Sequence, residues 1–387
     1  MPEKSRVAYV VNHAAFFVSH RLPLALGARK AGLDVALFTG QAGSEQMEAI
    51  AVAQLAASGI LHRRMVSRSS GMNPLLELFG LLQLISFLLR YRPQVVHCAS
   101  PKGVLYGGLA ARICRVPAVV LAISGMGYAF TQGAQQGAAR RWIRRIYGFL
   151  VRFAFGHPNG RVIVQNEDDR AALHVSGVIK PERVTLIPGS GVDLTLFANS
   201  KQAPKERMVL LPARMLEDKG VREFVAAARK LKQLVPDWRF VLAGAAGYDN
   251  PTAITRGELE QWQAEGVVEW LGHVEDMVPW FTSTAIVCLP SYREGMPKAL
   301  LEAAAAGCAV VTTDTTGCRE AIEFGVTGDL VPVRDADALA TALLSLIKDE
   351  ARRLSYGEKG RQRAVGRFSV DSVVQQTVGI YKELLNA

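Results

Sequence analysis

Two glutamates, Glu294 and Glu302, stand eight residues apart within the segment Ser291–Gly307. The apolar run Ala285–Pro290 before them predicts a buried parallel strand, and Pro297 suits the first position of a following helix. Glu302 would then lie about 8 Å along that helix, at 1.5 Å per residue. Backbone N–H groups at a helix start bind phosphate, and carboxylates bind hydroxyl groups. The spacing therefore predicts a sugar-diphosphate site, although a plain strand, turn and helix with two ordinary glutamates would give the same pattern.

Two cations follow another predicted strand, Met208–Pro212. They are Arg214 and Lys219, and they stand at a strand-to-helix turn. A guanidinium binds phosphate through two parallel hydrogen bonds, and an ammonium acts as a compact charge. The pair therefore suits a diphosphate. The alternative is a solvated surface pair, and the presence of Glu294 in the same half of the chain favours the ligand.

Other motifs for cofactors or metals are weak. The pattern Gly125-Met-Gly127 follows a predicted strand but lacks the third glycine of a dinucleotide fingerprint, and no GxxxxGK[ST] or HExxH motif occurs. Asp335-Ala-Asp337 could bind a metal, but it is more typical of a cap for the predicted helix 337–347. We therefore expect no metal and no cofactor.

Strand-like and helix-like segments alternate along all 387 residues, which predicts parallel sheets covered by helices. The length favours two domains. We expect an α/β chain of two doubly wound, Rossmann-like domains at 1–190 and 200–367, facing each other across a cleft, with a last helix within 368–387 crossing back to the first domain. Ligands of such sheets bind beyond the carboxyl ends of the strands. The predicted strands are Val7–Val11, Val35–Thr39, Gly59–Arg63, Val95–Cys98, Ala118–Ile123, Arg161–Gln165, Val184–Ile187, Met208–Pro212, Phe240–Ala243, Val267–Leu271, Ala285–Leu289, Ala309–Thr312 and Asp329–Pro332.

Composition excludes a disordered chain, because 49% of the residues are hydrophobic and 21% are charged. The net charge of +10 is uneven: residues 1–188 hold 22 Lys and Arg against 9 Asp and Glu, whereas the remainder has a small acidic excess. Only the first half is thus expected to meet an anionic partner. The five scattered cysteines form no CxxC pair, and the first apolar run is too short for a signal peptide, so a cytoplasmic location is expected.

Two segments of the basic half suggest a membrane surface. Residues 73–90 are apolar on nearly every face but fall short of the roughly 20 residues of a spanning helix, so a buried or interfacial helix is expected. Residues 140–152 interleave arginines with aromatic residues, as in helices that lie on anionic membranes. A nucleic-acid groove is the rival explanation, but no nucleic-acid motif accompanies it, and a packing helix with a solvated basic face is the plain alternative. The membrane candidates are Arg140, Arg141, Trp142, Arg144 and Arg145.

Taken together, these motifs resemble the retaining, nucleotide-sugar-dependent glycosyltransferases of family 4, which have the GT-B fold. The resemblance covers essentially the whole chain. It implies that Arg214 and Lys219 bind the donor diphosphate, that Glu302 binds the ribose and that the Val274 backbone meets the base. It also implies that Glu294 and the backbone of Gly295, Met296, Pro297 and Lys298 hold the transferred sugar and its phosphate, without a metal. The matching parts are Arg214 with Lys219-Gly220, Gly272–Met277, Pro290-Ser291, Glu294 to Glu302, Ala303–Gly307 and Gly325–Gly328.

Within this family the chain is most similar to PglA-like bacterial transferases, which add N-acetylhexosamines to polyprenyl-diphosphate-linked sugars. The segments that carry this are Phe17–Pro23, Ser100–Gly103, Ser124–Gly127 and Ile187–Asp193. The resemblance implies a UDP-sugar donor and a lipid-linked saccharide acceptor. Candidate acceptor residues are His13, His20, Lys102, Ser124 and Gly125; the two histidines also fall in the loop and helix after the first strand.

Two departures leave the acid/base residue unassigned. Many relatives have a glycine pair where this chain has Asn12–Ala15, and many have a histidine where it has Ser124-Gly125. Two other functions stay open: a UDP-sugar epimerase of the same fold, and a protein that binds nucleotide sugars without turnover.

Overall fold

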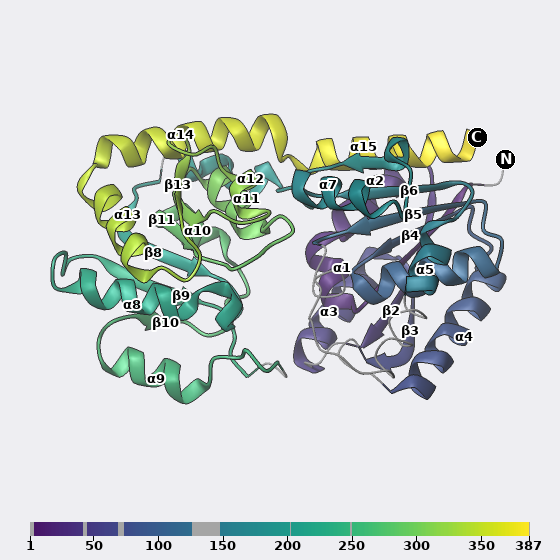
Figure 1. Ribbon diagram of the computed structural model, residues 1–387, viewed down its shortest axis with the longest axis horizontal. Coiled ribbons are helices and arrows are strands. Elements are labelled where there is room, and N and C mark those ends of the chain that lie inside the picture. Colours follow the sequence, from purple (N-terminus) through teal and green to yellow (C-terminus); the bar gives the residue numbers. More distant parts are fainter. Residues whose placement is uncertain are drawn as a thin grey trace. The chain divides into compact units, whose positions relative to one another are not determined.

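The computed structural model describes residues 4–41, 45–68, 73–125, 148–201, 203–247 and 250–386. The chain divides into two compact units (Figure 1). The first unit joins Met1–Pro188 to Asp371–Ala387, and the second is the continuous stretch Gly189–Val370. The chain thus passes between the units twice.

The first unit contains a seven-stranded sheet in the order β3-β2-β1-β4-β5-β6-β7. Every neighbouring pair is parallel, and the order reverses at β1, as in doubly wound folds. The strands are β1 (Arg6–Val11), β2 (Asp34–Gln41), β3 (Leu61–Arg68), β4 (Val95–Ala99), β5 (Ala118–Ile123), β6 (Gly160–Val164) and β7 (Val184–Leu186).

Helices cover both faces of this sheet because side chains alternate along each strand. In β1, Val7, Tyr9 and Val11 join one apolar core, and Ala8 and Val10 join another. Residues of α1, α2, α3 and α15 line the first core, and residues of α4, α5 and α7 line the second. The helices are α1 (Ala14–His20), α2 (Leu22–Lys30), α3 (Glu45–Ser58), α4 (Pro74–Tyr91), α5 (Pro101–Ile113), α7 (Glu167–Ser176) and α15 (Val370–Asn386).

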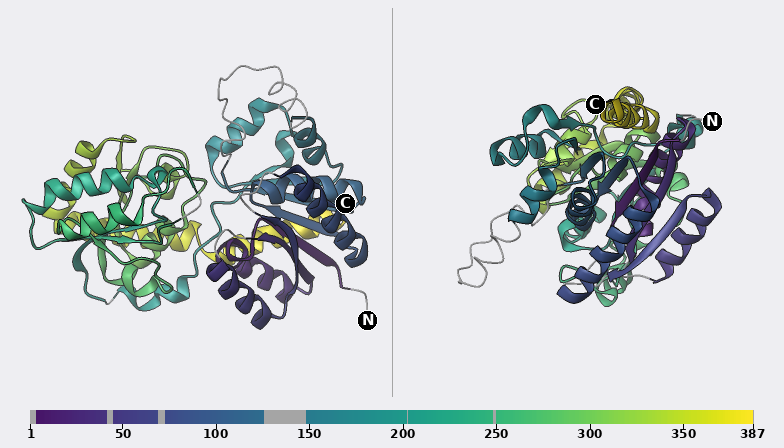
Figure 2. Two further views of the ribbon diagram at one scale, coloured as in Figure 1. Left: turned by 90° about the horizontal axis from the view of Figure 1, so that it is seen from below. Right: turned by 90° about the vertical axis from the view of Figure 1, so that its right-hand side faces the viewer.

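The helix α15 completes the first unit, although it comes last in the chain (Figures 1 and 2, yellow). Its Tyr381 is fully buried, and the Tyr381 hydroxyl lies 2.9 Å from the Tyr9 hydroxyl and 2.7 Å from Nδ1 of His97. Burial, with the nearby charge of Arg21, holds the pKa of His97 well below its usual value. A chain of polar contacts therefore fixes α15 against β1 and β4.

The second unit repeats the plan with a six-stranded sheet in the order β10-β9-β8-β11-β12-β13, again parallel throughout. Its strands are β8 (Glu206–Pro212), β9 (Arg239–Ala243), β10 (Glu269–Trp270), β11 (Thr284–Leu289), β12 (Ala309–Thr313) and β13 (Gly328–Val331). Its helices are α8 (Val221–Lys232), α9 (Arg256–Ala264), α10 (Val278–Ser283), α11 (Lys298–Ala306), α12 (Cys318–Ala321), α13 (Ala336–Lys348) and α14 (Glu350–Arg367).

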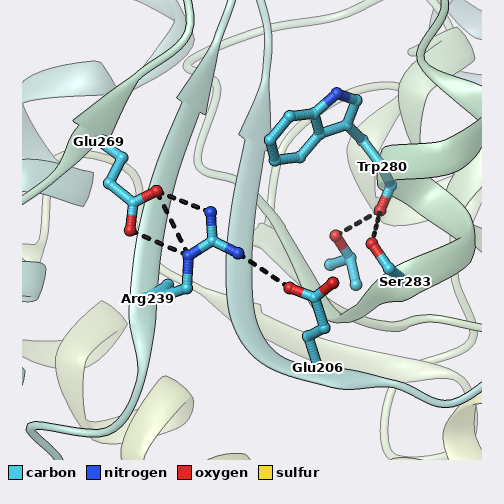
Figure 3. Close-up of polar contacts among 6 residues, drawn as sticks. Glu206, Arg239, Glu269, Trp280 and Ser283 are labelled. Carbon is cyan, nitrogen blue, oxygen red and sulfur yellow. Dashed lines mark hydrogen bonds and ion pairs between the residues drawn. The ribbon is translucent and has the colours of Figure 1, made fainter.

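The amino edge of the second sheet is joined by ion pairs (Figure 3). Arg239 at the start of β9 donates to both carboxylate oxygens of Glu269 on β10 and, at 2.8 Å, to Glu206 on β8. Nearby, Ser283, the last residue of α10, donates to the Trp280 carbonyl in the same helix. The ion pairs of Arg239 link three neighbouring strands at their amino ends, and the candidate site lies at the opposite, carboxyl edge.

Each predicted strand overlaps an observed one, and the differences lie at the ends. The predicted strand Gly59–Arg63 begins instead at Leu61, because Gly59 has a positive φ of 65° just after α3. Asp335 caps α13 by accepting from the amides of Asp337 and Ala338, as expected.

Candidate active site

The carboxyl edge of the second sheet brings Lys219 and Glu294 together. Lys219 follows β8, Glu294 follows β11, and the Lys219 ammonium lies 2.5 Å from Oε1 of Glu294. Ser291 donates to the same oxygen at 2.9 Å. The two charged side chains are only 13% and 16% exposed. An ion pair so shielded from water is held in one arrangement, so this cation and carboxylate form a fixed polar corner.

Glycines bring the two loops close enough for this contact. Gly220 has a φ of 70°, and a side chain there would meet the Pro290 carbonyl oxygen at 2.1 Å. This glycine ends a short 3₁₀ turn at Glu217–Lys219 and separates it from α8. Gly317 likewise packs against the Glu294 loop. A Cβ added at Gly317 would lie 2.5 Å from the carbonyl oxygen of Gly295, so only glycine allows this close backbone packing.

The helix α11 begins one residue later than predicted. Pro297 is the residue before the helix, with an extended ψ of 112°, rather than its first helical residue. The Pro297 carbonyl accepts from Leu300, so the amides of Lys298 and Ala299 precede the first bond of the helix. An amide pair at a helix start is a suitable place for a phosphate.

Lys298 and Glu302 pair with each other one turn apart on α11, at 2.9 Å. The sequence predicts separate ligand contacts for these two residues, but their i,i+4 spacing is also typical of a mutual ion pair. Both side chains are partly exposed, so a ligand can reach either one.

A pocket of about 570 Å³ lies at the carboxyl ends of β9 and β10. Gly272 and His273, directly before Val274, form part of its wall. Gly244 belongs to the same corner: it donates to the Gly272 carbonyl, and a side chain there would collide with the Ala213 carbonyl at 1.7 Å. Arg214 is exposed on the loop directly after Ala213. Other residues that line the pocket belong to no motif recognised in the sequence. They are Ala245, Ala246, Gly247, Arg256, Glu260, Gln263 and Trp270.

Neighbouring ionisable groups are held in their neutral forms. Burial raises the pKa of Tyr292 to about 12, helped by the hydrogen bond that its hydroxyl donates to Glu223. Burial also raises the pKa of Cys318 to about 12, and the Glu294 charge adds to the effect. The Cys318 side chain is therefore a neutral thiol. Within the described ranges, no three His, Cys, Asp or Glu side chains gather as a metal site.

The first sheet has a polar network at its own carboxyl edge. Ser100 donates to Oδ1 of Asn12 at 2.7 Å, the Asn12 amide donates to the Ser100 hydroxyl, and the Gly103 amide donates to Asn12. Ser100 has a φ of 70°, which is strained for a serine. Such strain is often found at functional sites, and no residue pattern around Ser100 predicts it.

The candidate acceptor residues follow β1, β4 and β5 in the chain. His13 caps α1 by accepting from the Phe16 amide at 3.1 Å, and His20 stacks on the Phe16 ring at 4.8 Å. Lys102, in the first turn of α5, pairs with Glu77 of α4 at 2.8 Å. Ser124 and Gly125 directly follow β5 and are partly exposed. The basic candidates Arg140, Arg141, Trp142, Arg144 and Arg145 lie outside the described residues.

Comparison with known families identifies the class of protein. Residues 19–189 match the family model described as "Glycosyl transferase 4-like domain", and residues 206–349 match "Glycosyl transferases group 1". The two matched segments together take up most of the chain, one in each unit. The chain therefore belongs to this family of glycosyltransferases, and its two units are the two Rossmann-like domains of the GT-B fold.

Particular relatives agree with this assignment. The chain is 28% identical over 333 residues to the N,N'-diacetylbacillosaminyl-diphospho-undecaprenol alpha-1,3-N-acetylgalactosaminyltransferase of Campylobacter jejuni, covering 82% of this chain and 84% of that one. It is 24% identical over 322 residues to the UDP-Gal:alpha-D-GlcNAc-diphosphoundecaprenol alpha-1,3-galactosyltransferase of Escherichia coli, covering 80% of each. Its fold is similar to that of Anabaena HepE, solved in complex with UDP, with a TM-score of 0.73, 17% identity, and coverage of 98% of this chain and 100% of that one.

Proposed function

We propose that this glycosyltransferase moves an N-acetylhexosamine, with retention of configuration, from a UDP-sugar to a saccharide carried on a polyprenyl diphosphate. The observation that carries the proposal is the shielded contact of Lys219 with Glu294, next to the start of α11. The names of the Campylobacter and Escherichia relatives support a diphosphate-linked lipid acceptor. Such acceptors are membrane-bound, which supports a peripheral location on the inner face of the cell membrane.

The donor would lie along the carboxyl edge of the second sheet. Lys219 and Arg214 would bind the diphosphate as cations. Glu294 would accept hydrogen bonds from hydroxyls of the transferred sugar, while Lys219 holds its carboxylate in place. The backbone of Gly295, Met296, Pro297 and Lys298, at the start of α11, would hold the sugar and the distal phosphate.

The nucleoside would occupy the remainder of this edge. Glu302 would bind the ribose hydroxyls, and Val274 would meet the base through its backbone beside the pocket at Gly272 and His273. Arg256 and Trp270 also line that pocket.

The chemical step follows from where charge develops. The acceptor hydroxyl oxygen bonds to the anomeric carbon on the face from which the diphosphate departs, and the bond from that carbon to the phosphate oxygen breaks. UDP leaves with the electron pair, and the hydroxyl proton passes to its phosphate oxygen. Lys219, Arg214 and the α11 amides stabilise the growing negative charge, because preorganised donors lower such barriers. No enzyme nucleophile and no metal is needed for this route.

A panel of UDP-sugars tests the proposal. Each is incubated with membrane lipid extract or with a purified polyprenyl-diphosphate saccharide, with and without EDTA, and UDP release is followed. We expect release only when donor and lipid acceptor are both present, unchanged by EDTA, and an axial linkage in the product by NMR when the donor is α-configured. Interconversion of a UDP-sugar without lipid would instead indicate an epimerase, and binding without turnover would indicate a sensor.

A further inference from the structure

The helix α4 packs against the first unit on one side and exposes apolar side chains on the other. Gly80, Leu84 and Leu88 are buried against the first unit. At about 100° per residue, five of the exposed apolar residues of α4 fall within one stripe on the opposite side of the helix, whereas Leu76, 45% exposed, lies outside it. Leu75 is 77% exposed and Leu89 is 56% exposed, at the two ends of this stripe. The stripe consists of Leu75, Leu78, Phe79, Leu82 and Leu89.

A bare apolar stripe on a surface helix indicates a binding partner. Among the described residues, α4 is the one helix long and apolar enough to cross a membrane by length and composition. Its buried face argues against crossing, because Leu84 and Leu88 belong to the core between α4 and the sheet. Its 18 residues also fall short of the roughly 20 that a span requires. A helix that lies flat on a bilayer satisfies both observations.

The charges around the stripe select an anionic surface. Residues 49–166 contain 14 Lys and Arg but a single acidic residue, Glu77. Glu77 is paired with Lys102 and is only 13% exposed, so it places little free negative charge near the stripe. Arg90 and Arg92 are exposed at the end of α4. The neighbouring strand β3 also exposes Arg63 and Arg64. Apolar side chains flanked by arginines are typical of helices bound at anionic membrane interfaces.

The stripe begins near the carboxyl edge of the first sheet, the edge with the candidate acceptor residue Lys102. Because α4 follows the parallel strand β3, its first turn lies near the carboxyl edge, and the Glu77–Lys102 contact ties that turn to the start of α5. Leu75, Leu78 and Phe79 therefore lie near Lys102, a candidate acceptor residue. Figure 1 shows α4 at the margin of the first unit, with no labelled helix drawn on its outer side.

We propose that this stripe of α4 inserts into the interfacial layer of an anionic bilayer and holds the carboxyl edge of the first sheet against the lipid headgroups. The inference deepens the proposed function, because a lipid-linked diphosphate would then meet Lys102 without leaving the membrane. The membrane surface depends only on the exposure of the stripe and the charges beside it, whatever reaction the enzyme catalyses.

Vesicle flotation of the full chain tests the surface. We expect the protein to float with vesicles of phosphatidylglycerol and phosphatidylcholine, and far less with phosphatidylcholine alone. The double variant Phe79→Glu, Leu82→Glu should lose at least about tenfold in binding, since it places two charges in the apolar layer. The matched control is Val175→Glu on α7, which is 88% exposed and far from α4 in sequence, and it should bind like the wild type. A Phe79→Trp variant should show a blue-shifted emission when anionic vesicles are added.

Equal flotation of the double variant and the wild type would overturn the proposal. So would a wild-type dimer that the double variant converts to a monomer, because a second copy would then cover the stripe. Transfer to a short-chain, water-soluble acceptor distinguishes a loss of membrane binding from a loss of transferase activity. The double variant should keep its rate on that acceptor and lose rate on an acceptor embedded in vesicles. A third outcome separates the two proposals: the double variant loses flotation, but the wild type transfers sugar to no acceptor. That outcome would support the membrane surface and contradict the proposed function.

Discussion

Lys219 and Glu294 lie 2.5 Å apart although 75 residues separate them in the chain. The contact joins the loops after β8 and β11, which are neighbouring strands of the second sheet. Each loop reaches the other because a glycine, Gly220, allows the Lys219 turn to lie directly on Pro290. A charge pair built by the strand order itself is expected to be rigid, and rigidity is what a site for a diphosphate leaving group needs.

Lys219→Ala should lower turnover by about 100-fold or more, because removing one preorganised donor typically lowers kcat by about that factor. Steady-state UDP release with the natural acceptor measures it. Lys230→Ala is the matched control, since Lys230 pairs with Asp337 on the exposed surface of the same unit. Comparable losses in both variants would indicate a general effect of lysine removal rather than a donor site.

Glu302→Gln should weaken UDP binding by about 10-fold or more, because a carboxylate accepts stronger hydrogen bonds from ribose hydroxyls than an amide does. The substitution also leaves the charge of Lys298 without its partner on α11. Calorimetric titration with UDP gives the affinity. Glu358→Gln, on the exposed side of α14, should bind UDP normally. Unchanged affinity in Glu302→Gln would remove this residue from the nucleoside site.

Gly220→Ala should destabilise the second unit and reduce turnover together. The added methyl group meets the Pro290 carbonyl oxygen at 2.1 Å, and the residue has a left-handed φ of 70°. Left-handed backbone alone costs an alanine about 1–2 kcal/mol. Gly257→Ala is the control, since a side chain there would contact nothing within 4 Å. Thermal unfolding and activity are measured for both variants. A normal melting temperature in Gly220→Ala would contradict the close packing of Gly220 on Pro290.

Acid should destabilise the first unit. Burial lowers the pKa of His97 well below 6.5, so the folded state binds fewer protons than the unfolded state under mildly acidic conditions. The stability contributed by neutral His97 is fully present above pH 6.5 and is lost as the pH falls below it, by up to about 1.4 kcal/mol per pH unit. Burial lowers the pKa of His157 in the same direction, which adds to the slope.

Amide hydrogen exchange in β1 and β4, recorded between pH 7 and pH 5 and corrected for intrinsic rates, measures this loss. Tyr381, Tyr9 and Arg21 surround His97, and its Nε2 has no hydrogen-bond partner among the described residues. His97→Gln should therefore flatten the slope, whereas His174→Gln, at an exposed position on α7, should not. If His97→Gln left the dependence of stability on pH unchanged, groups other than His97 would be responsible for the acid sensitivity.

The sequence was sufficient to predict the sheets, because runs such as Ala285–Leu289 are apolar at every position, as buried parallel strands require. It also predicted the fold class and the glycosyltransferase family. Features that arise from long-range packing escaped it. The positive φ of Ser100 carries no local signal, since serine does not favour that conformation. Trp270 and Arg256 lie on short or polar elements without a motif, and only the folded chain places them in one pocket. The Lys298–Glu302 pair, by contrast, has the i,i+4 spacing that favours such contacts on a helix.

The return of α15 to the first unit has a consequence for biosynthesis. A ribosome makes Tyr9 some 370 residues before Tyr381, its hydroxyl partner. The second unit is continuous and has all of its residues by Val370, before the first unit receives its last helix. Nascent chains should therefore lack part of the cover of one apolar face of the first sheet until α15 is made, because only α1, α2 and α3 are present before it. This uncovered part is where we expect a molecular chaperone to act.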